Sequence, residues 1–286
     1  MMTCVQGQAT SGATAGESVR DETGSLHGMR IGLIAGTLGQ GGAETQLWYI
    51  LRALRAAGAS PFVLCLTRGE HWEGRFRDEG IPVEWVGASG SRMVRVVAIA
   101  RRLRRLRADV IQSQHFYANI YAGLAGRILH RPSIGAIRSD GLSEARAAGR
   151  LTGRWQFGLP TILAVNSRVG IRNLQQMGIP DSRLAWLPNV IDTETFHSRA
   201  NGTDAGHAGP VTVAGVGRLV RVKRFDRFLR VIEAARAQSG VEVRAVIAGD
   251  GPERAALERL ARELGLGGTH LEFAGRLQDV RDLLGR

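Results

Sequence analysis

The chain has 286 residues, of which 44% are hydrophobic and 22% are charged, proportions that exclude a disordered or collagen-like protein. Its 38 basic and 26 acidic side chains give a formal net charge of +12, which favours phosphorylated ligands and anionic membrane surfaces. The longest apolar runs are strand-sized, and the two cysteines are too few for a disulfide framework or a zinc cluster. We therefore expect a cytoplasmic protein without a transmembrane helix.

The first lobe is predicted from an alternation of short apolar runs and amphipathic stretches, which is typical of a parallel α/β sheet covered by helices on both faces. Residues 1–28 are rich in small polar residues and predict a disordered tail. The expected strands are Arg30–Ala35, Pro61–Leu66, Pro82–Val86, Asp109–Gln112, Ser133–Ile137, Ile162–Val165 and Leu184–Leu187. The clearest helices between them are Ala43–Ala57, Met93–Arg107 and Tyr117–Leu129.

A second lobe follows a polar, non-periodic segment that predicts a linker. The expected organisation is a lobe at 29–200, a linker at 201–210 and a lobe at 211–286. The second lobe is expected to contain Val211–Gly215, Arg224–Gln238, Val241–Ala248, Glu253–Leu264, His270–Ala274 and Gln278–Leu284 as alternating strands and helices. Because it holds only about three strands, we interpret this lobe as incomplete and the chain as truncated.

A glycine-rich turn follows the first strand and opens the first helix. Gly41, Gly42 and Glu44 lie in this turn, where backbone N–H groups at a helix N-terminus can bind phosphate or a sugar hydroxyl. The turn lacks the third glycine of the dinucleotide motif and the Lys-Ser/Thr of a P-loop. A tight turn without a ligand is the alternative.

A basic loop, Gly217–Lys223, follows the first strand of the second lobe. Arg218 and Lys223 flank it and could clamp a diphosphate, and Lys223 is the only lysine in a chain whose other cations are all arginine. A solvated basic turn is the alternative. The next strand ends in a similar glycine turn, where Gly249 and Asp250 would let a flat base or ribose approach the backbone.

Three polar residues follow strands of the first lobe, at the sheet edge where such folds bind ligands. His115 follows the fourth strand, and Arg138 and Asp140 follow the fifth. Each could equally be structural. The segment Asn189–Phe196 is interpreted as a structural turn.

The arginines give no indication of nucleic-acid binding, because they are scattered and accompany no zinc-finger, RNA-recognition or basic-zipper pattern. The arginines of the expected helix Met93–Arg107 lie beside an apolar stripe. This pattern indicates either a helix that binds a membrane surface or a crossover helix with a solvated basic face. No D-x-D clamp or nucleophile elbow is present, so no metal site is predicted.

Taken together, these segments resemble the family 4 glycosyltransferases of the GT-B fold. The resemblance runs from Met29 to Arg286 and rests on the order of six short motifs. They are GGAE (Gly41–Glu44), NSR (Asn166–Arg168), LPNVID (Leu187–Asp192), GRLVRVK (Gly217–Lys223), AGDGPE (Ala248–Glu253) and FAG (Phe273–Gly275).

The resemblance implies two Rossmann-like lobes and transfer of a sugar from a UDP- or GDP-sugar, with retention and without a metal ion or cofactor. Arg218 and Lys223 match the pair that holds the donor diphosphate, and His115 matches the histidine near the donor sugar, so these three are the expected catalytic residues. Gly41 and Gly42 match the loop near the donor phosphates, and Gly249 and Asp250 match the turn near the nucleobase. A sugar or lipid-linked acceptor, cell-surface polysaccharide or glycolipid synthesis and a place at the inner face of the membrane are expected.

The chain departs from the family in ending before its Glu-x7-Glu element, so we expect weak or absent transferase activity from this chain by itself. A catalytically impaired nucleotide-sugar-binding module is therefore the main alternative. A sugar-nucleotide epimerase would share the two-lobed architecture, but GRLVRVK and AGDGPE fit transferases better.

Overall fold

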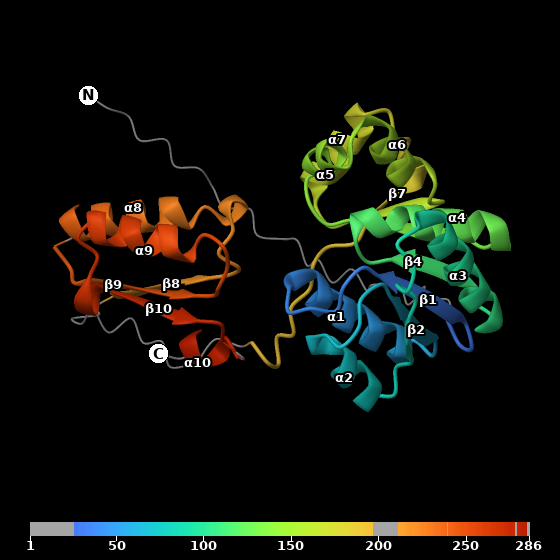
Figure 1. Cartoon of the computed structure of the whole chain (residues 1–286), viewed down its shortest axis with the longest axis horizontal. Coiled ribbons are helices and arrows are strands. Elements are labelled where there is room, and N and C mark those ends of the chain that lie inside the picture. Colours follow the sequence, from blue (N-terminus) through green and yellow to red (C-terminus); the bar gives the residue numbers. More distant parts are fainter. Residues whose placement is uncertain (1–25, 197–210, 239, 278, 285–286) are drawn as a thin grey trace, which may run out of the picture. The chain divides into compact units, whose positions relative to one another are not determined.

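The computed structural model describes residues 26–196, 211–238, 240–277 and 279–284 (Figure 1). Of the predicted tail only residues 26–28 are described, and the predicted linker at 201–210 lies outside the described residues. The chain divides into two compact units, Met1–Val190 and Ile191–Arg286.

The first unit is built on a seven-stranded sheet in the order β3-β2-β1-β4-β5-β6-β7, and every neighbouring pair is parallel. The parallel α/β class predicted from the alternating pattern is therefore confirmed. The strands are β1 (Arg30–Ala35), β2 (Ser60–Cys65), β3 (Val83–Trp85), β4 (Val110–Ser113), β5 (Ser133–Ile137), β6 (Ile162–Val165) and β7 (Leu184–Trp186).

Helices cover both faces of this sheet, which explains why the central strands are continuous apolar runs rather than alternating ones. Leu33 and Val63 face α1 and α2, whereas Ile34 and Leu64 face α3 and α4, and all four side chains are buried. The helices are α1 (Gly42–Ala56), α2 (His71–Asp78), α3 (Arg92–Arg105), α4 (Asn119–Leu129), α5 (Leu142–Ala148), α6 (Arg150–Gly158) and α7 (Arg168–Gln176).

The strand order fixes where a ligand of the first unit is expected. From β1 the chain runs outward to β2 and β3, and from β4 it runs outward in the opposite direction. In open parallel sheets, ligands bind beside the carboxyl ends of the two strands at such a reversal. The turn after β1 and the residues after β4 and β5 lie at that edge.

The second unit has a three-stranded parallel sheet in the order β10-β9-β8. Its strands are β8 (Val211–Val216), β9 (Val243–Ala248) and β10 (Leu271–Gly275). Helices α8 (Phe225–Gln238) and α9 (Arg254–Glu263) pack on one face, and the short α10 (Arg281–Leu284) packs on the other through Leu283 (Figure 1). Among the described helices of both units, none has the length and apolarity needed to cross a membrane.

Candidate functional site

The glycine turn after β1 is held by a carboxylate that the sequence analysis did not identify. Glu70 lies just before α2 and accepts hydrogen bonds from the Thr37 hydroxyl at 2.8 and 2.9 Å, from the Leu38 N–H and from the Thr67 hydroxyl at 2.5 Å. Burial alone would raise the pKa of Glu70, but these hydrogen bonds together outweigh it and lower the pKa. An ionised Glu70 therefore fixes the conformation of the turn.

His115 holds the same turn at Gly36. Its Nδ1 accepts a hydrogen bond from the Gly36 N–H at 3.1 Å, and its Nε2 lies 3.1 Å from Glu44 Oε1. Because a backbone N–H can only donate, Nδ1 carries no proton, so Nε2 carries the ring proton and donates a hydrogen bond to Glu44 Oε1. His115 is thus a neutral imidazole whose two nitrogens join the turn to α1.

The packing of the turn explains why a glutamate stands at position 44 and a glycine at position 41. The Glu44 side chain is 7% exposed and its Oε1 pairs with His115. A Cβ at Gly41 would lie 2.5 Å from Glu44 Oε2, whereas a Cβ at Gly42 would meet nothing within 4 Å. Binding of donor or acceptor by these three residues stays a prediction.

The ring of Tyr117 packs beside the turn. Tyr117 is a second residue of the site that the sequence did not indicate. Its ring stacks on His115 with centroids 5.4 Å apart, and the residue is 47% exposed. A Cβ at Gly36 would lie 1.8 Å from the Tyr117 hydroxyl oxygen, so this position requires glycine while Tyr117 stays in place. Burial, with the nearby Glu44, raises the pKa of Tyr117 to about 12.

Arg138 lies at the same edge, after β5. Its Nη2 donates a hydrogen bond to Gln114 Oε1 at 3.1 Å, and the Gln114 amide donates to the Ala43 carbonyl at the start of α1. His115 and Arg138 are therefore joined to the glycine turn through separate contacts. By contrast, Asp140 is exposed, and its carboxylate accepts from the Ser143 N–H at 2.8 Å in the first turn of α5.

In the second unit, the two glycine turns pack directly against each other. The Leu219 N–H donates to the Asp250 carbonyl at 2.9 Å, and the Glu253 N–H donates to the Leu219 carbonyl at 3.1 Å. A Cβ at Gly249 would lie 1.9 Å from the Gly217 carbonyl oxygen. Gly249 is therefore required by backbone packing, and contact with a nucleobase stays a prediction.

Arg218 and Lys223 lie at the two ends of the loop that leaves β8. Both residues are exposed, and Lys223 closes a 3-10 turn that begins at Arg221. Neither side chain pairs with an acid among the described residues. Their charges are thus available to a ligand at the carboxyl edge of the sheet, as the predicted diphosphate clamp requires.

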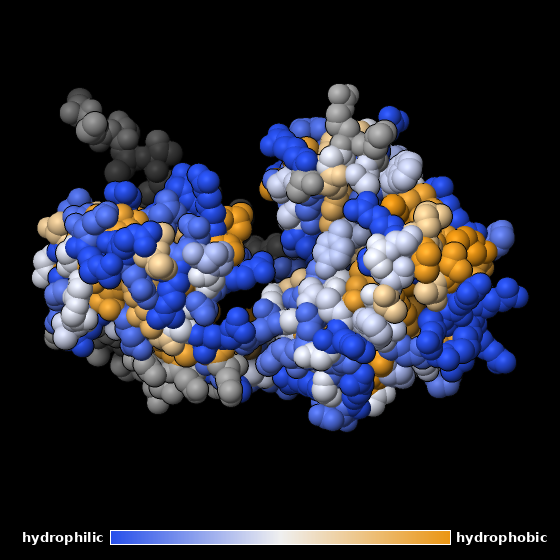
Figure 2. All heavy atoms as spheres, in the orientation of Figure 1, coloured by the Kyte–Doolittle hydropathy of each residue, from blue (hydrophilic) through white to orange (hydrophobic). Residues whose placement is uncertain are grey.

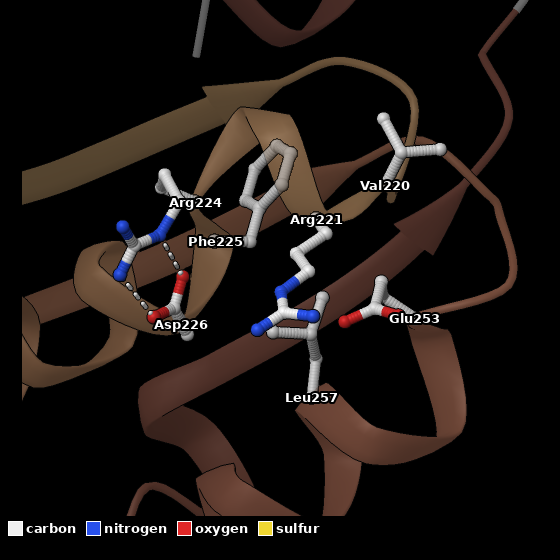
Figure 3. Close-up of a pocket in the computed structure, with 7 residues that line it drawn as sticks. All are labelled: Val220, Arg221, Arg224, Phe225, Asp226, Glu253 and Leu257. Carbon is white, nitrogen blue, oxygen red and sulfur yellow. Dashed lines mark hydrogen bonds and ion pairs between the residues drawn. The ribbon is translucent and has the colours of Figure 1, made fainter.

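A hollow of about 300 Å³ lies between this loop and the N-terminal ends of α8 and α9 (Figure 3). Arg221 reaches across it toward Glu253 and Leu257, and Arg224 forms a two-pronged ion pair with Asp226. Neither Arg218 nor Lys223 lines this hollow. It is therefore separate from the predicted clamp.

Comparison with known proteins covers both units. Residues 205–286 match the family model described as "Glycosyl transferases group 1". One curated relative is the GDP-mannose-dependent alpha-(1-6)-phosphatidylinositol dimannoside mannosyltransferase of Mycobacterium tuberculosis, 36% identical over 103 residues. That match covers 35% of this chain and 26% of the relative, so the chain aligns with about a quarter of the relative's length.

Solved structures show the two-lobed fold that the resemblance implied. HepE of Anabaena in complex with UDP-glucose has a TM-score of 0.72 and 19% identity, over 90% of this chain and 71% of HepE. The UDP-GlcNAc 2-epimerase of Methanocaldococcus jannaschii has a TM-score of 0.54 and 13% identity, over 90% of this chain and 76% of the epimerase.

The fold alone therefore does not separate a transferase from an epimerase. The family matches do, because both describe glycosyltransferases. Residues 40–195 match the model described as "Glycosyltransferase Family 4". This chain is therefore a member of that glycosyltransferase family.

Proposed function

We propose that this protein transfers a sugar from a nucleoside-diphosphate sugar to a hydroxyl acceptor, with retention at the anomeric carbon. The observation that carries the proposal is the exposed pair Arg218 and Lys223, free of acidic partners among the described residues, at the carboxyl edge of the second sheet. The relative from Mycobacterium tuberculosis uses GDP-mannose and HepE binds UDP-glucose, which supports a donor of this class.

The chemistry assigned to the pair is stabilisation of the leaving group. During transfer the bond from the anomeric carbon to the diphosphate oxygen breaks, and a new bond forms to the acceptor oxygen. The acceptor proton passes to the departing diphosphate, and the two fixed cations neutralise the remaining negative charge. His115 is not assigned as the base, because Nδ1 already accepts the Gly36 N–H and Nε2 carries the proton.

Titration calorimetry with UDP and GDP, paired with a turnover assay, tests the proposal. Replacement of Lys223 by alanine removes a charge-assisted hydrogen bond, so we expect about tenfold weaker binding or more, and about 100-fold slower turnover. Arg227→Ala, at an exposed cation of α8, is the matched control. Equal affinities of wild type and Lys223→Ala would refute the clamp, and binding without turnover would identify the impaired module.

For the acceptor, we propose a lipid-linked molecule reached from an anionic membrane surface, in glycolipid or cell-surface polysaccharide synthesis. The first turns of α3 expose Met93, Val94 and Val97, with Arg101 and Arg104 exposed farther along the helix. Figure 2 shows hydrophobic surface over α4 and the adjoining part of α3, next to hydrophilic surface. Apolar and cationic side chains together favour peripheral binding to anionic lipid.

A further inference from the structure

The two sheets of the described residues have four edge strands, β3, β7, β8 and β10. An edge strand presents unpaired N–H and C=O groups to any other strand, and natural proteins protect such edges by short length, charge or irregular register. Strands β3 and β7 have three residues each, and β3 carries Glu84. Strand β10 carries Glu272, and its register with β9 shifts between Phe273 and Gly275. These three edges are therefore protected.

Strand β8 has none of these protective features. Its six residues, Val211–Val216, are uncharged and include no proline, and four of them are valine or threonine, which favour extended backbone. Its register with β9 continues without a shift from Val211 to Val216. Within the described ranges, β9 is its only neighbouring strand. Of the described edges, β8 is therefore the one most open to pairing with a further strand.

The hydrogen bonds to β9 show which backbone groups of β8 point outward. The N–H of Val211 and the N–H of Gly217 donate to carbonyl groups at the two ends of β9, at 2.8 and 2.9 Å. Alternate residues of a strand direct their N–H and C=O groups to the same side, so the odd-numbered residues of β8 face β9. The N–H and C=O groups of Thr212, Ala214 and Val216 therefore point to the open edge.

The side chains of the same three residues lie on an exposed face of the sheet. Val213 packs into the core cluster under α8, and a Cβ at Gly215 would lie 3.0 Å from a phenylalanine ring of α8. Because side chains alternate between the two faces of a strand, Thr212, Ala214 and Val216 face away from α8. All three residues are exposed, Val216 by 52%. The open edge thus combines free backbone groups with small and apolar side chains.

We propose that two copies of this protein associate by antiparallel pairing of their β8 strands across a two-fold axis at Ala214. In this register Ala214 lies opposite Ala214 of the partner subunit and Thr212 lies opposite Val216 of the partner subunit. Every outward N–H and C=O group of the three residues then finds a partner. The two three-stranded sheets become one continuous sheet.

A second copy suits this edge for two reasons. The smallest of the three side chains, Ala214, lies at the axis, and the β-branched Thr212 and Val216 oppose each other on both sides of it, a cross-strand pairing that stabilises sheets. The strand also carries no charge, so it neither repels its own copy nor offers a charged partner a contact. Stable interfaces bury about 1,200–2,000 Å², more than two short strands provide, so we expect a reversible dimer that forms at high protein concentration.

Sedimentation velocity over about 5–500 µM protein tests the pairing, since unpaired strand edges associate at micromolar to millimolar concentrations. We expect the wild type to shift from monomer to dimer across this range. Ala214→Pro removes the outward N–H at the axis but none of the hydrogen bonds to β9, and edge strands tolerate proline at such positions. This variant should remain monomeric at every concentration, with an unchanged far-UV circular-dichroism spectrum.

A charge swap tests the antiparallel register itself. Thr212→Lys/Val216→Lys places lysines opposite each other in the proposed dimer, and Thr212→Glu/Val216→Glu places glutamates there, so each double variant alone should stay monomeric. An equimolar mixture brings opposite charges together and should restore the dimer. Val231→Lys/Gln238→Lys, which adds the same charge at exposed positions of α8, is the matched control and should dimerise as the wild type does.

Three results would overturn the proposal. The first is a wild type that stays monomeric up to about 500 µM. The second is a dimer that persists in Ala214→Pro and in both charge variants, which would place the contact elsewhere. The third is an equimolar mixture of the folded lysine and glutamate variants that stays monomeric. The measurement involves no nucleotide, so its outcome is independent of the proposed transfer reaction.

Discussion

Two carboxylates hold the glycine turn of the first unit through different residues. Glu70 accepts from the hydroxyl of Thr37 and the N–H of Leu38, and Glu44 accepts from His115, which in turn accepts from the Gly36 N–H. Because the turn itself contributes mainly backbone groups, its conformation depends on these side chains from other elements. A preformed turn reduces the entropy lost when a ligand binds.

Glu70 predicts a specific pH dependence of stability. Its pKa is lowered in the folded state from the ordinary value of 4.5, so its contribution is present above that value and is lost as the pH falls through the folded-state pKa. We expect Glu70→Gln to be less stable than wild type at pH 7, with the difference shrinking in acid. Urea unfolding at neutral and acidic pH measures this difference. Glu79→Gln, at an exposed acid near the end of α2, is the control, and equal stability of Glu70→Gln and wild type at pH 7 would contradict the role.

We expect substitution of Gly249 to destabilise the second unit. In Gly249→Ala the added methyl group would lie 1.9 Å from the Gly217 carbonyl oxygen, a backbone atom that cannot rotate away. We expect a loss of about 3 kcal/mol or more in the free energy of unfolding. Gly267→Ala, where a Cβ meets nothing within 4 Å, should be neutral by comparison. Similar unfolding midpoints of the two variants would show that the turns can separate without cost.

The candidate site residues could be predicted from the sequence, but the side chains that hold them in place by hydrogen bonds could not. His115, Arg138 and the glycine turn were identified because each follows a strand of a parallel sheet. Glu70 and Gln114 were not, since their contacts join residues far apart in the chain and no local pattern marks them. Tyr117 was read as the start of a helix, whereas Phe116–Ala118 forms a 3-10 turn before α4 that brings its ring onto His115.

At the scale of single elements, strands were easier to predict than helices. The ten strands of the described residues all lie within one or two residues of the expected ranges, because buried parallel strands are continuous apolar runs bounded by polar residues. Helix α2 was not named, since Trp72 and Phe76 are the only large apolar residues in an otherwise polar segment. These two side chains are buried against Trp48 of α1, a long-range contact that stabilises the helix.

Helix α3 carries the prediction on membrane binding. Arg102 and Arg105 both pair with Glu84, which leaves Arg92, Arg101 and Arg104 as the exposed cations of this helix expected to contact lipid. At about 1 kcal/mol per cation lost, the double variant Arg101→Glu/Arg104→Glu should bind anionic vesicles at least about 30-fold more weakly. Co-sedimentation with phosphatidylserine vesicles at low and physiological salt measures this change.

The matched control for α3 reverses two exposed arginines of α8, in Arg227→Glu/Arg230→Glu, and keeps the same change in net charge. If both double variants lose vesicle binding equally, net charge alone explains it and α3 is a solvated crossover helix. Selective loss in the α3 variant supports a membrane-binding surface.

On the scale of the whole molecule, the described cores are separate. The buried clusters of the first unit, around Leu33 and Ile34, share no residue with the cluster around Leu229 in the second. All five tryptophans belong to the first unit, so tryptophan fluorescence reports on that unit alone, whereas far-UV circular dichroism reports on both.

This distribution makes independent unfolding measurable. Leu229→Ala should destabilise the second unit by about 2–5 kcal/mol, the usual cost of emptying a buried leucine site. The circular-dichroism transition should therefore change, while the fluorescence transition keeps its midpoint. Leu33→Ala should shift the fluorescence transition instead. A common shift of both signals in either variant would mean that the two units unfold as one.

The composition of the chain gives the basic loop of the second unit a practical property. Lys223 is the sole lysine and its side chain is exposed at the end of the 3-10 turn. Reductive methylation with ¹³C-formaldehyde would thus place an isotopic label on one side-chain amine, with the α-amino group as the other reactive position. Its nuclear magnetic resonance signal would follow the arrival of a nucleotide at this loop directly, without any amino-acid substitution.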